Sequence, residues 1–156
     1  NEQFFERVKP MKKDRTFQAV LLGFPIIPVL EIYTQIMKQL DFTSLSALEA
    51  ISLMWLKKPN IPLGILGALG LISWFSILSY HSSKIWGMDY FPLKTMLLGM
   101  TAESVMFIIF GVLGQNELLV HDVSGNFVHA TASAISSLAA GFLMRKYLFN
   151  VEQRKD

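Results

Sequence analysis

Three ionisable side chains occur in stretches of the sequence that are otherwise apolar: Glu31, Glu103 and His129. A charged group near the centre of a bilayer costs at least about 2.5–3.5 kcal/mol, so such residues usually face the interior of a helix bundle and serve a function. Thr101 and Ser133 stand close to Glu103 and His129 in the sequence and add hydroxyl groups. Together the five residues predict a polar pocket within a membrane.

The chemistry that such a pocket would support is the binding of a proton or a cation. Glu103 would exchange the proton or hold the cation, with His129 as its partner or relay. A purely structural role is the alternative for each residue. Glu103 could be hydrogen-bonded to serine and threonine hydroxyls and fix the register of the helices, Glu31 could meet water near the interface, and His129 could meet a loop carbonyl.

Metal binding and catalysis have less support in the sequence. His121 and Asp122, together with the three residues above, are acceptable oxygen and nitrogen ligands for a divalent cation. No pair on one predicted helix has the spacing H-x-x-x-H or E-x-x-H, however, and the chain has no cysteine. No recognisable nucleophile motif surrounds any serine. We therefore expect no metal, no cofactor and no enzymatic activity.

The elements that must position these residues are long apolar stretches. Of the 156 residues, 52% are hydrophobic and only 17% are charged, which is low for a soluble domain. The apolar residues form four windows of about the length that a helix needs to cross a bilayer. These windows are 16–37, 62–80, 91–113 and 127–148. The sequence predicts an all-α, four-helix membrane bundle with a single domain.

The first span and the connection after it carry the clearest local signals. Pro25 and Pro28 each remove a backbone donor and predict a kink. In the connection, Ser46 and Glu49 form an S-x-x-E capping box that predicts the start of a helix over about 46–57. This helix would either lie amphipathically in the membrane interface, with Trp55 among the headgroups, or pack over the mouth of the bundle.

Small residues recur on the second and fourth spans, where they would allow helices to approach closely. The residues concerned are Gly64, Gly67 and Gly70 on the second span, and Ala130, Ala134, Ser137 and Gly141 on the fourth. These faces favour a small membrane protein that acts through helix–helix association, as a homo-oligomer or as an accessory subunit of other membrane proteins. The alternative hypothesis is a proton- or cation-linked transporter or channel component in which Glu103, Glu31 and His129 form the polar pocket.

The distribution of basic residues predicts the orientation. Five Lys and Arg residues lie in the N-terminal tail, two in the loop 81–94 and four at the C-terminal end, against three in 38–61 and none in 114–126. The excess on one side places both termini in the cytoplasm and the protein in the cell membrane. The tail 1–15 would be a solvated segment or a short helix on anionic lipid. A net charge of +2 is too small to favour nucleic acid as a partner.

The order of features resembles that of small four-span bacterial inner-membrane proteins of uncharacterised function. The matching cues are a Gly-Phe-x-x-x-Pro-like opening in the first span, a Leu-Lys-x-x-x-x-Gly entry to the third (Leu93, Lys94, Gly99), and a small-residue fourth span that ends Gly-x-x-x-Arg (Gly141, Arg145). The resemblance covers most of the chain. It implies an integral membrane protein in the lipid bilayer and implies no activity.

Overall fold

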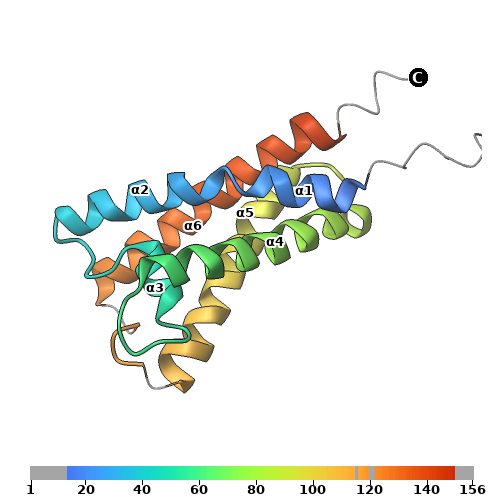
Figure 1. The fold of residues 1–156 in the computed structure, drawn as a ribbon. Coiled ribbons are helices and arrows are strands. Elements are labelled where there is room, and N and C mark those ends of the chain that lie inside the picture. Colours follow the sequence, from blue (N-terminus) through green and yellow to red (C-terminus); the bar gives the residue numbers. More distant parts are fainter. Residues whose placement is uncertain (1–13, 115, 120–121, 150–156) are drawn as a thin grey trace, which may run out of the picture.

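The computed structural model describes residues 14–114, 116–119 and 122–149, and every regular element within these ranges is a helix (Figure 1). The α-helices are α1 (Arg15–Gly23), α2 (Ile26–Gln39), α3 (Ala47–Ser52), α4 (Ile61–Trp86), α5 (Phe91–Met106) and α6 (Val123–Met144). The π-helical segments η2 (Phe107–Leu113) and η3 (Arg145–Phe149) continue α5 and α6.

Four of the resulting segments are long and apolar enough to cross a membrane: Arg15–Gln39, Ile61–Trp86, Phe91–Leu113 and Val123–Phe149. The predicted all-α architecture with four membrane-spanning helices is therefore confirmed. The described chain begins and ends at the same end of the bundle, as an even number of crossings requires (Figure 1). Residues 1–13 of the predicted N-terminal tail, and His121, lie outside the described residues.

The first span is interrupted where the sequence predicts a kink. Asp14 caps α1 by accepting a hydrogen bond from the Phe17 N–H. The helix stops at Gly23, and α2 begins at Ile26, directly after Pro25. A proline cannot donate to the preceding turn, so the helix divides into two parts at this position. Pro28 falls in the first turn of α2, where its missing N–H does no further harm.

The connecting helix α3 starts at the predicted capping box but is shorter than expected and more enclosed. Ser46 accepts from the Glu49 N–H and Glu49 accepts from the Ser46 N–H, so both halves of the box are present. The helix ends at Ser52, whereas the sequence predicts an end near residue 57. Most of 43–53 is buried against α2 and α4. Of the two expected placements, the structure shows the helix packed into the mouth of the bundle.

The second span is longer at its C-terminal end than its hydropathy predicts. Residues 81–86, which belong to the predicted loop 81–94, instead continue α4 as far as Trp86, and Ser83 is buried. Gly87 then turns the chain with a φ of +72°, which suits glycine because it has no Cβ. The ammonium of Lys94 donates to the Trp86 carbonyl at 2.6 Å and so satisfies an otherwise open group at the end of α4.

The fourth span begins four residues before the predicted position. Asp122 accepts a hydrogen bond from the Gly125 N–H and starts α6 at Val123 rather than at Phe127. This earlier start adds a turn in front of His129. The histidine therefore lies deeper in its span than the sequence analysis placed it.

Close packing in the bundle depends on small residues that face one another. A Cβ added at Gly99 of α5 would lie within 2 Å of the Ser137 hydroxyl of α6, and one added at Gly141 would lie 2.6 Å from the Pro92 backbone. On the other side of the bundle, Gly23 of α1 lies against Ser76 of α4. Small side chains at these crossings let the helix backbones approach each other.

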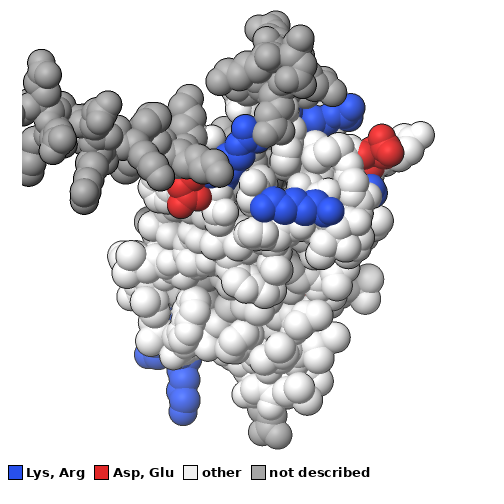
Figure 2. Space-filling view, turned by 90° about the vertical axis from the view of Figure 1, so that its right-hand side faces the viewer, with Lys and Arg blue, Asp and Glu red and all other residues white. Residues whose placement is uncertain are grey.

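The surface between the two ends of the bundle carries little charge. On the face drawn in Figure 2, Lys and Arg lie toward both ends and Asp and Glu at the upper end, with a broad uncharged belt between the ends. Large apolar residues such as Leu97, Val105, Ile108 and Phe142 are exposed on the described surface. The 26 residues of α4 extend about 39 Å at 1.5 Å per residue, enough to cross a hydrocarbon core of about 30 Å. These features suit a multi-pass membrane protein.

Two buried serines on α4 give a matched test of this packing. The Ser83 hydroxyl donates to the Tyr80 carbonyl at 2.6 Å, whereas the Ser79 hydroxyl is buried with no hydrogen-bond partner among the described residues. We expect Ser83→Ala to lower the free energy of unfolding by about 0.5–1.5 kcal/mol and Ser79→Ala to leave it unchanged or slightly raised. Thermal unfolding in detergent would measure both, and a larger loss for Ser79→Ala would contradict this account.

Candidate functional site

A cavity of about 190 Å³ lies at the centre of the bundle, with walls contributed by α2, α3, α4, α5, η2 and α6. Each span contributes a lining residue from near its middle, namely Ile26, Ile72, Glu103 and Ser136, and the connecting segment contributes Ala47, Ala50, Ile51 and Met54. The cavity therefore extends from α3, at the mouth of the bundle, to the midplane of the membrane that the four spans would cross. Substrate and ion sites of many membrane transporters occupy this depth.

The polar groups in this cavity come from α5 and α6. Glu103 lines the wall on α5, and the Ser133 hydroxyl of α6 lies within hydrogen-bonding reach of its carboxylate. Glu103 is the twelfth residue after Phe91 and the tenth before Leu113, so it is central in its span. It is the only acidic residue among those that line the cavity, and His129 is the only other one with a titratable side chain.

His129 is held between a connecting segment and the π-helical end of α5. The residue is 5% exposed, and its Nε2 lies 3.4 Å from the Thr43 hydroxyl oxygen. The ring of Phe107 meets it edge-to-face, with centroids 5.7 Å apart. Thr43 also donates to the Leu45 carbonyl at 3.2 Å. The imidazole is therefore positioned by 43–45 and by η2 while it lines the same cavity as Glu103.

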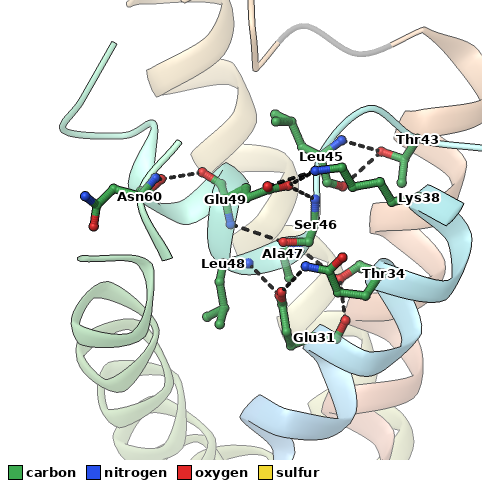
Figure 3. A network of polar contacts seen from close by, with 12 residues as sticks. Glu31, Thr34, Lys38, Thr43, Leu45, Ser46, Ala47, Leu48, Glu49 and Asn60 are labelled. Carbon is green, nitrogen blue, oxygen red and sulfur yellow. Dashed lines mark hydrogen bonds and ion pairs between the residues drawn. The ribbon is translucent and has the colours of Figure 1, made fainter. Parts of the chain in front are cut away.

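The structure places Glu31 in a different environment. Its Oε2 accepts the Leu48 N–H of α3 at 2.9 Å, and its Oε1 accepts the side-chain amide of Gln35 at 2.8 Å (Figure 3). It is not among the residues that line the cavity. Thr101, also predicted in the pocket, is exposed and donates to the Leu97 carbonyl one turn earlier. Glu103, His129 and Ser133 are thus the predicted residues that the structure brings together.

Glu31 belongs to a set of caps that satisfies the whole N-terminus of α3. The first four N–H groups of a helix have no partner within it. Here the N–H of Ser46 donates to Glu49, that of Ala47 to Thr34, that of Leu48 to Glu31, and that of Glu49 to Ser46 (Figure 3). Two of these acceptors stand on α2, so the caps also attach α3 to the first span.

An ion pair completes this attachment. The Lys38 ammonium lies 2.6 Å from one Glu49 oxygen and 2.8 Å from the other. Burial by itself opposes ionisation of Glu49, but the hydrogen bonds from Lys38 and the Ser46 N–H, with the charge of Lys38, hold the pKa of the carboxyl below its ordinary value of 4.5. Glu49 is therefore ionised at neutral pH and joins α3 to the end of α2.

The ion pair predicts how stability depends on pH. Because the pKa of Glu49 is lower in the folded than in the unfolded chain, its contribution is complete above about 4.5 and disappears as the pH falls through the folded value. We expect Lys38→Gln to destabilise the protein at pH 7 but to have much less effect at pH 3. Unfolding in detergent at both values would test this. A destabilisation of equal size at pH 3 would contradict the ionic contribution.

The predicted small-residue faces have different neighbours. A Cβ on Gly64 would lie within 2.5 Å of the Leu48 carbonyl oxygen, and one on Gly67 would meet the ring of Trp55, so these two glycines accommodate α3 and the segment after it. Gly70 has no such neighbour within 4 Å. On α6, Ser137 and Gly141 are buried against α5, whereas Ala130 and Ala134 are only partly buried.

Sequence reasoning missed several residues that shape the site. Thr34 and Thr43 are buried, and they connect 43–47 to α2 and α6. Phe107 packs on His129 because α5 continues into η2. Thr34 could have been identified from the sequence, because it lies on the same helical face as Glu31. Thr43 gave no such signal, because its partner is 86 residues away in the sequence.

Among the described residues, no group of three or more His, Asp or Glu side chains is arranged to hold a metal ion. No protein-family model, curated protein or solved structure matches this chain. The cavity and the residues that line it are therefore the features of the molecule that bear on its function.

Proposed function

We propose that this protein is a proton- or cation-linked membrane transport component whose binding group is Glu103. The observation that supports the proposal is the position of this carboxylate. It stands at the middle of a span and lines a cavity that it shares with His129 and Ser133. An acidic residue at this depth is energetically costly unless it is paired or faces the interior of the bundle. Such residues often mark the pathway of an ion or a proton.

The neighbouring groups suit such a role. The Ser133 hydroxyl can donate to the carboxylate when Glu103 is charged and can remain as an oxygen ligand when a cation binds. His129 adds a nitrogen that can take up or release a proton in the physiological range. The other lining residues are mostly apolar, so few other groups compete with these three for a bound ion.

Association with a second copy or with another membrane subunit is the other role that the sequence favours. Its basis was the small-residue faces of the second and fourth spans. In the structure, Gly64 and Gly67 accommodate α3 and Trp55, and Ser137 and Gly141 accommodate α5. Packing within the chain accounts for these four residues, so they give no separate reason to invoke a partner. The cavity is the better-supported basis for function.

We also propose that both termini face the cytoplasm and that the protein resides in the cell membrane. Arg15, Lys84, Lys94, Arg145 and Lys146 flank the ends of the spans on the side of the termini, whereas Lys38, Lys57 and Lys58 flank the other side. The side with more basic residues near the spans normally stays in the cytoplasm. On this orientation, α3 and its ion pair lie toward the outer side.

The transport proposal predicts the effect of Glu103→Gln. In proteoliposomes with a trapped pH-sensitive dye, we expect wild-type protein to let protons enter when a potassium gradient with valinomycin drives them. Glu103→Gln should reduce entry at least about tenfold, toward the protein-free level, because its amide cannot exchange a proton.

Thr101→Val is the matched control, since Thr101 lies two residues away on the same helix but outside the cavity. It should retain the wild-type rate. Size-exclusion profiles and helical content in detergent would show that both variants fold. Equal proton entry through wild-type and Glu103→Gln protein, or no entry through either, would contradict proton-linked transport through Glu103.

A further inference from the structure

Two residues of the cavity wall also reach the outer surface at the side of the bundle. Trp74 of α4 and Glu103 of α5 both line the cavity, yet Trp74 is 56% exposed and Glu103 is partly exposed. Their shared exposure on neighbouring helices points to a gap in the wall between them. Because both residues lie near the middle of their spans, this gap faces the interior of the bilayer.

The borders of the gap can be traced along α4 and α5. Toward the turn at Gly87, the two helices are in contact, since a Cβ on Gly99 would lie 3.5 Å from the Phe75 ring. Toward the other end, Met54 of the segment after α3 and Met106 of α5 both reach the cavity wall. Between these borders, α5 runs obliquely to α4 (Figure 1). We call this gap, between Leu71 and Trp74 on one side and Ala102 and Glu103 on the other, the lateral window.

The lining of the cavity points to a class of ligand. Its one carboxylate attracts a cation, and the aromatic rings of Trp74, Phe75 and Phe107 also line the wall. Aromatic faces attract organic ammonium groups, most strongly where water is excluded. The rest of the lining is mainly aliphatic and suits an apolar body. An apolar cavity of about 150 Å³ can hold benzene, so 190 Å³ suits a compact body of roughly six to ten carbons.

From these observations we infer that the cavity binds a lipophilic amine, which enters from the bilayer through the lateral window as the neutral base and takes the proton of the Glu103 carboxyl, leaving an ammonium and a carboxylate. The ammonium pairs with Glu103 and the apolar body fills the space between α4 and α6. This inference rests on the proposed role of Glu103 and adds the ligand class and the route. A molecule that already partitions into lipid reaches the midplane directly, whereas a hydrophilic ion would have to cross half of the bundle from water.

Binding can be followed through Trp74 in protein reconstituted into lipid nanodiscs, with Trp55 and Trp86 replaced by Phe so that Trp74 alone reports. The probes are 1-adamantylamine and 1-adamantanol, which have nearly the same shape and differ in charge. We expect saturable changes in fluorescence, with the amine bound about 10- to 100-fold more tightly than the alcohol. Glu103→Gln should bring this ratio close to one. A ratio near one in the unsubstituted background would overturn the inferred ligand class.

The route is tested by narrowing the window. Ala102→Phe should slow both association and dissociation of 1-adamantylamine at least about tenfold, whereas a variant that only filled the cavity would speed dissociation. Leu71→Phe tests the same window from α4, in case the first variant does not fold. Val105→Phe, on an exposed part of α5, is the matched control and should leave both rates unchanged. Unchanged rates in a folded window variant would overturn lateral entry.

The two proposals fail in different ways. Proton entry that depends on Glu103, without binding of 1-adamantylamine, would overturn the inferred ligand and leave the transport proposal standing. Amine binding that depends on Glu103, without proton entry, would support the inferred site and overturn proton-linked transport. If Glu103→Gln changed neither measurement, both proposals would be overturned.

Discussion

Replacing Gly64 by alanine is expected to displace α3 and to lower the free energy of unfolding by about 3 kcal/mol. A Cβ at this position would lie within 2.5 Å of the Leu48 carbonyl oxygen and 2.8 Å from its carbon. Both atoms belong to backbone, and the helix that carries them is fixed by its caps on α2, so it cannot rotate away as a side chain could. Either α4 shifts outward, or α3 leaves its site.

Gly70→Ala on the same helix is the matched control for this substitution. No neighbouring atom lies within 4 Å of a Cβ built there, so only the helix propensity changes. Alanine should then stabilise the protein by about 0.5–1 kcal/mol. Circular dichroism during heating in detergent would compare the two variants. If both changed stability by the same amount, the close contact between α3 and α4 would not explain the effect.

Glu31→Ala is expected to have the second-largest effect on stability, about 2–3 kcal/mol. Its carboxylate accepts the Leu48 N–H and the Gln35 amide, both in the part-buried region between α2 and α3. Alanine leaves these donors unsatisfied where water has poor access, and an unpaired polar group is costly in such a place. The loss should be localised, with faster amide hydrogen exchange over 43–53 than over α4.

Glu31→Gln separates the capping role from a role of the charge. Glutamine keeps one side-chain oxygen for the Leu48 N–H, and Gln35 can turn its amide to match, so we expect roughly half of the lost stability to return. Glu117→Ala, in an exposed part of the loop before α6, is a control that should cost less than about 0.5 kcal/mol. If Glu31→Gln reduced proton entry as much as Glu103→Gln, Glu31 would have a role in transport in addition to capping α3.

The general architecture could be predicted because it depends on the length and polarity of single segments. The third span matches its predicted bounds, and the capping box at Ser46 starts α3. Helix ends were harder to predict. Residues 81–86 are polar enough to suggest a loop, but Lys94 satisfies a carbonyl at the end of α4 and the helix continues. Asp122 starts α6 early by a cap that the hydropathy pattern does not show.

The site could be predicted in part, for the same reason. The depth of Glu103 in its span, with Ser133 and His129 on the next helix, follows from helical geometry once the spans are known. The hydrogen-bond partner of Glu31 could not be predicted in this way, because it depends on where the six-residue helix α3 packs. The partners of the small residues could not be predicted from the sequence either. Their spacing predicts close contact, but only the three-dimensional arrangement shows that Gly64 meets α3 and that Gly141 meets Pro92.

The capping of α3 has a consequence for the order of assembly during synthesis. Every acceptor for its leading amides comes from residues that the ribosome adds earlier, or from the helix itself. Residues 43–53 could therefore enter the lipid beside α2 before α4 is made, because none of the leading backbone N–H groups of α3 would face hydrocarbon without a hydrogen-bond acceptor. The first span and 43–53 would then need no later segment to satisfy the leading N–H groups of α3. Helix α4 would dock on them afterwards, because Gly64 and Gly67 leave room for α3 and Trp55.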